Sequence, residues 1–358
     1  MKKLSLIIPC YNEENTLELC INRVLDIKDS NLDLELIIVD DYSKDNSLNI
    51  AYKLEKEHPE VKVLKHDVNM GKGASLRTGF LYATGDYVGI QDADNEYNPQ
   101  DYKKLLSPLK NGQADVVYGS RYLQPETRRI LYFWHTCMNK FLTFFSNMFT
   151  DLGITDMETC YKLFKKDVIK KIAPQLKENR FGFEPEITAL VSESKCKVYE
   201  CAISYNPRTY DEGKKIGWMD GLRAIYCILH YSAHRAPLPM HIIMYFIINT
   251  LSALTNVVAF SIFVNYFNLL YAILISFVLA AICNYLLCII LLFKHLSRWK
   301  KYPEIFVYSL CVIAVFFIDY YITYFFIKFN CPPLVAKSIS IILCFFLNYS
   351  FRKLIVFK

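Results

Sequence analysis

The stretch Leu4-Ser-Leu-Ile-Ile-Pro9 decides the fold of the first half of the chain. It is a short apolar run stopped by a proline, as a buried parallel strand would be. The residues Glu13–Ile27 then carry apolar side chains at intervals of three and four, which predicts a helix. A strand followed by such a helix is the repeating unit of a parallel, doubly wound sheet.

The same pattern continues along the chain. Four more apolar runs predict strands, at Leu34–Val39, Val61–Leu64, Tyr87–Ile90 and Ala114–Tyr118. Helical patterns lie between them, from about Ser43, over Gly71–Ala83 and over Pro99–Leu109. We therefore predict an α/β fold with a Rossmann-like, mostly parallel sheet. Ligands of such sheets bind beyond the carboxyl ends of the strands, so residues that directly follow a strand are site candidates.

Two carboxylates, Asp92 and Asp94, flank Ala93 directly after the fourth predicted strand. Paired carboxylates suit a hard cation such as Mg²⁺ or Mn²⁺, whose remaining positions diphosphate oxygens and water would fill. Glu96 is close enough in sequence to join the metal, or it is a solvent-facing loop acid. Ordinary turns also produce such pairs, and the position at a strand end is what favours the metal site.

Two further strand-end or helix-start motifs each allow two interpretations. Asp40-Asp41 could accept hydrogen bonds from a ribose or a base, or could stabilise the next helix through its dipole. Gly71-Lys72-Gly73 could bind an anion with backbone N–H groups and an ammonium group, or could be a plain tight turn. It lacks the spacing of a Walker A loop.

Two later segments are less specific. Phe183-Glu-Pro-Glu186 has the composition of a helix start and needs no catalytic role. The cationic stretch Arg208–Lys215, which includes Lys214, could hold a lipid phosphate at a membrane surface or attract anionic headgroups.

The composition changes near residue 235. Hydrophobic residues make up 53 % of the chain, but after that point they form long runs. These runs predict an all-α transmembrane domain of four helices, since about 20 residues cross a bilayer. They are Met240–Phe263, Leu269–Phe293, Ile305–Ile327 and Leu334–Phe351. The preceding Gly217–Ala236 has one apolar face and predicts an interfacial amphipathic helix or, alternatively, a core helix of the first domain.

The membrane half contains an internal repeat. Residues 240–294 and 304–358 match at a constant offset of 64, for example Asn284 with Asn348 and Tyr285 with Tyr349. Asp319 lies inside the third span. Such acids are functional or paired within a bundle, so either a partner such as Lys337 or a tyrosine, or a role in lipid handling, is expected.

The basic loop Lys294–Lys301 and the positive-inside rule predict a multi-pass membrane protein with the first domain and both termini in the cytoplasm. The twelve cysteines form no CxxC pair, which favours reduced thiols. The net charge of +6 suits a membrane surface. The sequence has no compact basic patch with interleaved aromatic residues, which is the pattern that would indicate binding of nucleic acid.

Taken together, the motifs of the first half resemble the family-2 glycosyltransferases, which have the GT-A fold. The matching stretches are Ser5–Glu14, Ile38–Asp41, Gly71–Gly73, Asp92–Asp94 and Gly119–Arg121. Asp156–Phe164 through Gly182–Ile187, together with Pro207–Ile216, resemble polyprenyl-phosphate monosaccharide synthases more narrowly. The membrane half resembles the small GtrA-like domains. These likenesses imply a catalytic domain over 1–216, an interfacial segment over 217–237 and a transmembrane domain over 238–358.

The resemblance also implies roles for individual residues. Donor binding would fall to Pro9, Tyr11, Glu13, Val39, Asp41, Lys72, Asp92, Ala93, Asp94 and Arg121. The acceptor phosphate would meet Arg121, Arg208 and Lys214. A metal would be held by Asp92, Asp94 and Glu96, and Asp92, Asp94 and Arg208 would be catalytic. Tyr42 departs from the family, which often has glycine there.

The implied reaction is the inverting transfer of one hexose from a nucleotide-sugar, of the GDP-mannose or UDP-glucose type, to dolichyl or undecaprenyl phosphate. A phosphate monoester is largely a dianion at neutral pH, because its second pKa is about 6, and so it needs no general base. Two alternatives are a processive polysaccharide synthase and a non-catalytic lipid-linked sugar carrier or flippase. The processive enzymes carry a Q-x-x-R-W signature, of which His295-Leu-Ser-Arg-Trp299 is only a near match.

Overall fold

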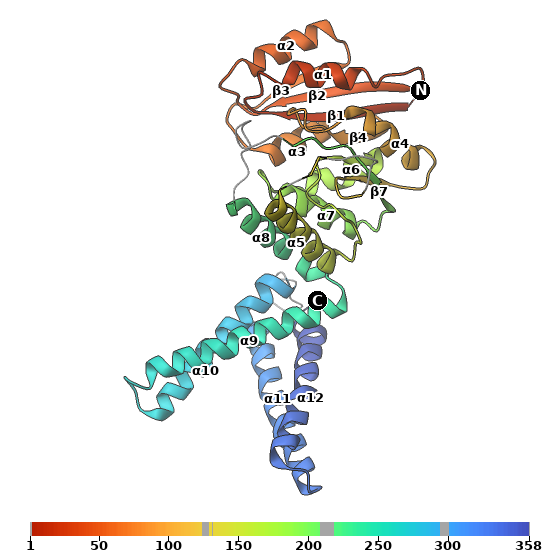
Figure 1. Ribbon diagram of the computed structural model, residues 1–358. Helices are drawn as coiled ribbons and strands as arrows, with labels where there is room; N and C mark the ends of the chain where they lie inside the picture. Colours follow the sequence, from red (N-terminus) through yellow and green to blue (C-terminus); the bar gives the residue numbers. More distant parts are fainter. Residues whose placement is uncertain (1, 124–128, 131, 208–217, 294–300, 358) are drawn as a thin grey trace. The chain divides into compact units, whose positions relative to one another are not determined.

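The computed structural model describes all residues except 1, 124–128, 131, 208–217, 294–300 and 358. The chain divides into two compact units, Met1–Arg235 and Ala236–Lys358. Figure 1 shows a sheet flanked by helices in the first unit and long helices in the second.

The first unit is built on one sheet with the strand order β3-β2-β1-β4-β6-β5-β7. Its strands are β1 (Lys2–Cys10), β2 (Leu32–Asp40), β3 (Val61–Lys65), β4 (Tyr87–Ile90), β5 (Val116–Ser120), β6 (Lys162–Lys165) and β7 (Val198–Ala202). All five strands expected from the sequence are present and run in one direction. The prediction of a mostly parallel α/β sheet is therefore confirmed.

Strand β6 is the exception to the parallel arrangement. It lies between β4 and β5 and is antiparallel to both. The sequence did not predict it, because Lys-Leu-Phe-Lys has only two apolar residues and one of its lysines is fully buried. Strand β7, parallel to β5 at the sheet edge, was also not predicted. Because β6 is inserted there, the loop after β4 and the loop after β5 lie on either side of it.

Helices cover the sheet, and their amphipathic faces explain where they lie. They are α1 (Leu17–Leu25), α2 (Ser47–Glu57), α3 (Lys72–Tyr82), α4 (Tyr102–Lys110), α5 (Phe133–Thr150), α6 (Lys166–Ile172), α7 (Phe183–Glu193) and α8 (Trp218–Ser232), with short 3-10 turns at Pro99–Asp101, Ala173–Gln175 and Ala233–Arg235. Helix α1 buries Leu17, Ile21 and Val24, the stripe that its sequence predicted. Helix α5 had not been expected from the sequence.

The second unit consists, in its described residues, of α9 (Leu238–Phe263), α10 (Leu269–Leu287), α11 (Lys301–Lys328) and α12 (Pro333–Phe351). Helix α9 packs against α10, and α11 packs against α12. Within the described residues, three stretches are long and apolar enough to cross a membrane: Leu238–Phe263, Ile275–Phe293 and Phe306–Lys328. A fourth span over α12 stays a prediction.

The helices of this unit recur at the interval seen in the sequence. Helix α10 passes into a π-helical turn at Cys288–Phe293, and α12 passes into another at Arg352–Val356. The rings of Phe293 and Phe357 stack with their centroids 4.3 Å apart. The intramembrane acid Asp319 accepts a hydrogen bond from the hydroxyl of Ser340, at 2.7 Å.

Candidate active site

The loops after β1, β2 and β4 meet at one edge of the sheet. In the strand register, Pro9 lies beside Val39, and Ile7 lies beside Ile90, the last residue before the Asp92 loop. Tyr11 follows β1 and is partly exposed. The sheet thus places Pro9, Tyr11, Val39 and the Asp92 loop at one edge, and their contact with a donor stays a prediction.

Lys72, at the start of α3, lies directly on the first carboxylate of the acidic loop. Its Nζ is 2.8 Å and 3.0 Å from the two carboxylate oxygens of Asp92, and 3.8 Å from Oε1 of Glu184. Burial alone would lower the pKa of Lys72, but the charge of Asp92 raises that pKa well above its usual value. The ammonium group is therefore a permanent positive charge beside the loop.

Asp41 organises the turn that leads into α3. Its carboxylate is buried and accepts the backbone N–H groups of Met70 and Gly71, at 2.9 Å and 2.6 Å. Its Oδ1 also lies 2.7 Å from Nδ1 of His66. The described geometry therefore gives Asp41 a structural role, and contact with a nucleotide stays a prediction.

Gly71 is required by this turn. Its φ of +96° lies in the region that favours glycine, and a Cβ there would lie 2.4 Å from the carbonyl oxygen of Asn179. The N–H of Ala74 donates to the same carbonyl. The glycine thus lets the segment around Asn179 lie directly against the start of α3.

Tyr42 occupies the position at which the family often has glycine. Its φ is +64°, in the left-handed region that side chains rarely adopt. The ammonium group of Lys44 lies 3.5 Å from the centre of its ring. The departure noted in the sequence thus leaves a strained backbone at the end of β2.

Asp94 and Glu96 are both engaged within the loop after β4. An oxygen of Asp94 accepts the N–H of Glu96, and the hydroxyl of Tyr205 donates to the Glu96 carboxylate at 2.5 Å. In the described part of the chain, no group of three or more His, Cys, Asp or Glu side chains is placed to hold a metal. The assignment of Asp92, Asp94 and Glu96 as metal ligands stays a prediction.

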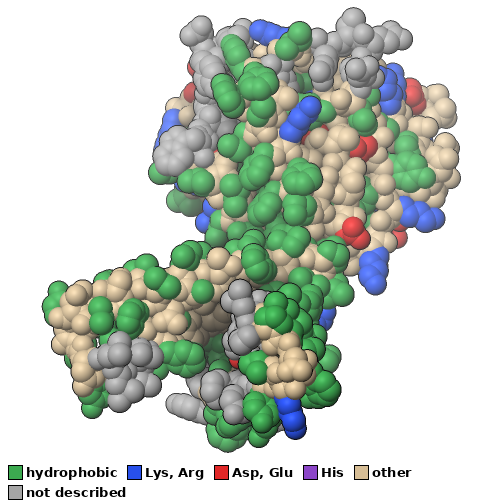
Figure 2. Space-filling model, turned by 60° about the horizontal axis from the view of Figure 1, so that its bottom comes forward, with side chains coloured by type: hydrophobic (Ala, Val, Ile, Leu, Met, Phe, Trp, Pro, Cys, Tyr) green, Lys and Arg blue, Asp and Glu red, His purple; other side chains and the backbone are tan. Residues whose placement is uncertain are grey.

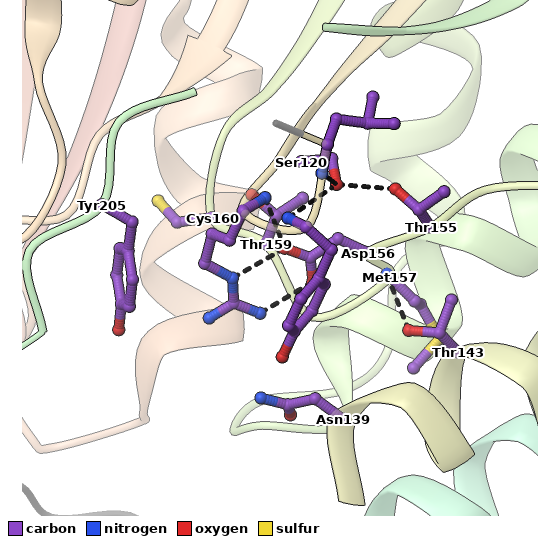
Figure 3. A network of polar contacts seen from close by, with 12 residues as sticks. Ser120, Asn139, Thr143, Thr155, Asp156, Met157, Thr159, Cys160 and Tyr205 are labelled. Carbon is purple, nitrogen blue, oxygen red and sulfur yellow. Dashed lines mark hydrogen bonds and ion pairs between the residues drawn. The ribbon is translucent and has the colours of Figure 1, made fainter. Parts of the chain in front are cut away.

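Arg121, directly after β5, is held by a bidentate ion pair with Asp156, which is labelled in Figure 3. Its Nε and Nη2 each lie 2.7 Å from a different oxygen of Asp156, which is fully buried. Its guanidinium carbon lies 5.1 Å from the centre of the Tyr205 ring. Burial alone would lower the pKa of Arg121, but Asp156 raises it well above its usual value. The pair fixes a permanently charged guanidinium next to Tyr205.

Behind Arg121 lies a buried ionic group that the sequence analysis did not identify. The Nζ of Lys162 is fully buried, donates to the carbonyl oxygens of Met157 and Thr159, and pairs with Glu184. Glu184, read from the sequence only as a helix-start residue, thus joins Lys162 to Lys72. Burial and the Glu184 charge raise the pKa of Glu158 to about 7. The group holds the turn that carries Asp156.

A cluster of four tyrosines lies beside the acidic loop. The ring centroids of Tyr97, Tyr161 and Tyr102 follow one another at 4.7 Å and 4.5 Å, and Tyr205 lies 4.9 Å from Tyr97. The hydroxyl of Tyr102 donates to the carbonyl of Ile90 at 2.5 Å. These rings fix the position of the loop after β4.

Two cavities adjoin at Arg129 and Tyr205, which line both. The larger one is polar and includes Arg23, Asn95, Glu96, Tyr97, Asn98, Ser204 and Asn206. The other, of about 250 Å³, is mainly apolar and includes Arg121, Tyr122, Ile130, Phe133, Thr136 and Ile203. Arg129 donates to the Asn206 side chain and to the carbonyl of Pro207. Arg208 and Lys214 lie outside the described residues. Arg129 and Tyr205 are not part of any motif in the sequence that indicated a site.

Comparison with known proteins agrees with this architecture. Residues 5–173 match the family described as Glycosyl transferase family 2, and residues 244–357 match the GtrA/DPMS transmembrane domain. A dolichyl-phosphate beta-glucosyltransferase of Trichomonas vaginalis is 30 % identical over 217 residues, which is 57 % of this chain and 65 % of that protein. The dolichol-phosphate mannosyltransferase of Pyrococcus furiosus is 24 % identical over 352 residues, 97 % of each chain.

A solved structure shares the fold of the first unit. The glucosyl-3-phosphoglycerate synthase of Mycobacterium tuberculosis, in complex with Mn²⁺, uridine diphosphate and phosphoglyceric acid, has a TM-score of 0.51 at 18 % identity. The match covers 66 % of this chain and 80 % of that one. This likeness concerns the fold alone.

Fold and site together define a GT-A-like α/β domain joined to a helical membrane domain. The two family matches place a glycosyl transferase family 2 domain at residues 5–173 and a GtrA/DPMS transmembrane domain at residues 244–357. It spans about 65 % of the length of the Trichomonas relative.

Proposed function

We propose that this protein transfers a single hexose, with inversion, from a nucleotide-sugar of the UDP-glucose or GDP-mannose type to a polyprenyl phosphate. The observation that carries the proposal is the pair of adjoining cavities. One is polar and reaches the acidic loop at Asn95 and Glu96, and the other places Arg121 among the apolar Ile130 and Phe133. A phosphate attached to a hydrocarbon chain has the chemistry that such a pair would bind.

The combination of domains supports the same reaction. The Pyrococcus furiosus relative, named a dolichol-phosphate mannosyltransferase, matches nearly the whole of this chain, including the membrane domain. The Trichomonas relative is named for transfer of glucose to dolichyl phosphate. Both names specify a lipid phosphate as acceptor, whereas they differ in the sugar.

In the proposed reaction, an oxygen of the acceptor phosphate attacks the anomeric carbon of the sugar. The bond between that carbon and the donor diphosphate breaks, and the nucleoside diphosphate leaves with the electron pair. The acceptor dianion needs no base, because its second pKa is about 6. Arg121, Arg208 and Lys214 would hold the phosphate by charge-assisted hydrogen bonds. Pro9, Tyr11, Glu13, Val39 and Asp41 would hold the nucleoside.

The residues after β4 fit a divalent cation whose coordination shell is completed by oxygens of the substrate. Mg²⁺ usually takes one or two protein carboxylates, with substrate phosphates and water as its other ligands, and Asp92 and Asp94 provide two carboxylates at a strand end. Bound there, Mg²⁺ or Mn²⁺ would supply positive charge to the leaving diphosphate. Lys72, 2.8 Å from Asp92, neutralises that carboxylate and would contact the donor phosphates.

For this reaction, the protein would be a multi-pass membrane protein. Its catalytic domain and both termini would face the cytoplasm, where nucleotide-sugars are made. The basic segment Lys294–Lys301 between two apolar helices supports this orientation.

The test is a transfer assay with the full-length protein in lipid nanodiscs. A panel of UDP- and GDP-sugars is supplied with or without dolichyl or undecaprenyl phosphate. We expect one sugar per lipid to be transferred, only when the polyprenyl phosphate is present. Longer glycan products would indicate a processive synthase, and donor binding without any transfer would indicate a carrier. Either result would overturn the proposal.

The variant Asp94→Asn tests the proposed metal site. Loss of a metal ligand should reduce turnover by at least about 100-fold, since such charge stabilisation amounts to several kcal/mol. EDTA should have the same effect on the wild type. Asp86→Asn, at an exposed acid paired with Lys2, is the control and should retain activity. Full wild-type activity in EDTA would exclude the metal.

A further inference from the structure

Both glycines of the Gly71-Lys72-Gly73 motif allow a close contact between two backbone segments. A Cβ on Gly71 would lie 2.4 Å from the carbonyl oxygen of Asn179. A Cβ on Gly73 would lie 2.4 Å from the carbonyl oxygen of Glu178. Because these distances are far shorter than a van der Waals contact, a side chain at either position would push the segments apart. The lysine between the two glycines is therefore held where the neighbouring segment, residues 176–180, places it.

Helix α3 is also bound to segment 176–180 through its second turn. The guanidinium of Arg77 donates to the carbonyl oxygen of Leu176 at 3.3 Å and to the side chain of Asn179 at 2.8 Å. The N–H of Ala74 donates to the carbonyl oxygen of Asn179. Two successive turns of α3 are thus bonded to the same segment. A shift of segment 176–180 would have to move the start of α3, including Lys72.

Helix α8 binds the same segment through the side chain of Glu178. The Nη2 of Arg223 donates to both carboxylate oxygens of Glu178, at 3.0 Å and 2.9 Å, and the hydroxyl of Tyr231 donates to Oε1 at 3.0 Å. A Cβ on Gly182 would lie 2.6 Å from the sulfur of Cys227 in α8, so the approach is close. The Glu178 side chain is only 9 % exposed. A buried carboxylate is unfavourable without partners, so Glu178 depends on α8.

These hydrogen bonds add direction to the packing of α8. The helix is a packed part of the first unit, as one of the two interpretations of its sequence expected. It buries Ala224, Cys227 and Ile228 and lies against α5 and α7. Figure 2 shows that hydrophobic side chains cover much of the face of the first unit that the turned view brings forward. Hydrophobic contacts have no direction, whereas hydrogen bonds do. The bonds to Glu178 therefore fix the register of α8 on the first unit.

A cavity of about 640 Å³ lies where these elements meet. Its lining includes Asn69 and Met70, from the turn before α3, and Asp220 and Arg223 of α8. The turn and the helix thus face each other across open space at this place. Residues 177–181 also line the cavity and form the bridge between its two walls.

We infer that Glu178 is a positioning residue that transmits the position of α8 to Lys72. The chain of contacts runs from Arg223 to the Glu178 carboxylate, and from the backbone of residues 178 and 179 to the start of α3. Its end point is the ammonium group of Lys72, 2.8 Å from Asp92. A misplacement of about 1 Å can lower turnover about 100-fold. The effect on donor binding rests on the proposed function, whereas the link itself does not.

Acylation of Lys72 tests the link without any catalysis. In the full-length protein in nanodiscs, we expect a water-soluble N-hydroxysuccinimide ester to acylate Lys72 slowly, because Asp92 holds its proton. Arg223→Met should raise that rate several-fold, measured by mass spectrometry relative to the exposed Lys110. Arg223→Lys should restore the slow rate, since a single nitrogen of Arg223 makes both bonds to Glu178 and an ammonium group can replace it.

The matched control breaks a different ion pair of the same region. Arg235, in the turn after α8, pairs with Glu193, the last residue of α7, and neither belongs to segment 176–180. Arg235→Gln should leave the acylation of Lys72 unchanged. If it acts like Arg223→Met, general anchoring of the helix is sufficient and the role of Glu178 is excluded. Slow acylation of Lys72 in Arg223→Met would also overturn the inference.

Donor affinity tests the functional part of the inference. UDP-glucose and GDP-mannose are titrated calorimetrically into the wild type, Arg223→Met, Lys72→Met and the double variant. Arg223→Met should weaken donor binding several-fold when Lys72 is present and change it little when Lys72 is absent, because coupled residues are not additive. Equal weakening in both backgrounds would contradict a role through Lys72. If neither nucleotide-sugar binds to the wild type, the proposed function fails, and the acylation rates still decide the link.

Discussion

At the scale of single residues, Glu158 makes the stability of the fold depend on pH. Burial and the Glu184 carboxylate raise its pKa to about 7, although Lys162 and Arg121 act in the opposite direction. An unfolded glutamate titrates near pH ~4.3. Between these values the folded protein keeps a proton that the unfolded chain has released. The free energy of unfolding therefore falls as pH rises from about 4.3 to about 7.

The variant Glu158→Gln should remove this pH-dependent fall in the free energy of unfolding. We expect it to match the wild type near pH 4 and to exceed it by roughly 1–3 kcal/mol at pH 8. Thermal unfolding of the full-length protein at both pH values, followed by near-ultraviolet circular dichroism, measures the difference. Glu57→Gln, at an exposed position of α2, is the control. A difference that is the same at both pH values would contradict the assignment.

The residues that the sequence could identify are those that directly follow a strand or begin a helix. Asp92 and Lys72 each stand at the boundary of an element, and the structure places them 2.8 Å apart. The ion pair of Lys162 with Glu184 and the bidentate partner of Arg121 had no such signal. Their members come from separate elements, and only the folded sheet brings them together.

At the scale of elements, the turn before α3 depends on Gly71. An alanine there would carry the strain of a φ of +96°, and its Cβ would meet the carbonyl oxygen of Asn179 at 2.4 Å. Either the start of α3 or the segment at Asn179 would have to move, and Lys72 is the first residue of α3. We expect Gly71→Ala to lower both stability and the affinity for donor.

The matched control is Gly112→Ala. Gly112 also has a positive φ, +71°, but an added Cβ would meet nothing within 4 Å. The substitution should lower the free energy of unfolding only by the backbone strain, about 1 kcal/mol. It should leave the affinity for donor unchanged. Gly71→Ala should cost at least about twice as much. Thermal unfolding and calorimetric titration of the donor compare the two, and equal effects would show that the contact with Asn179 is unimportant.

The elements that the sequence missed are also informative. Strand β6 is four residues long and begins with a buried lysine, so neither length nor alternation of apolar residues indicated it. Helix α5 reverses the usual pattern, because it exposes large hydrophobic side chains and buries Thr143, Ser146 and Thr150. A pattern search that expects polar residues on the surface does not identify such a helix.

At the scale of the whole molecule, Arg352 joins the two halves of the membrane domain. Its guanidinium donates to the Asn284 side chain, lies 3.2 Å from the sulfur of Cys288, and donates to the Tyr308 hydroxyl at 3.1 Å. Cys288 stands at the equivalent position in the first repeat half. A small, uncharged residue there leaves room for a single buried arginine between the halves.

Arg352→Met should leave the oxygens of Asn284 and Tyr308 without this donor. A buried polar group without its partner costs about 1–3 kcal/mol. We expect loosening of the bundle, seen as faster maleimide labelling of the buried Cys288 in nanodiscs, quantified by mass spectrometry of its peptide. Lys353→Met, at the exposed neighbouring cation, is the control. Unchanged labelling in Arg352→Met would show that the guanidinium does not hold the halves together.

The antiparallel strand β6 has a consequence for biosynthesis. On a ribosome, β4 emerges long before β6, its neighbour in the finished sheet. Until Lys162–Lys165 has been translated, β4 can pair on one side only, with β1, and its other side is an open edge. Open edges invite pairing with other nascent chains. The interval between the synthesis of Ile90 and that of Lys165 is therefore the period in which this domain most needs a chaperone, before the first membrane helix has been made.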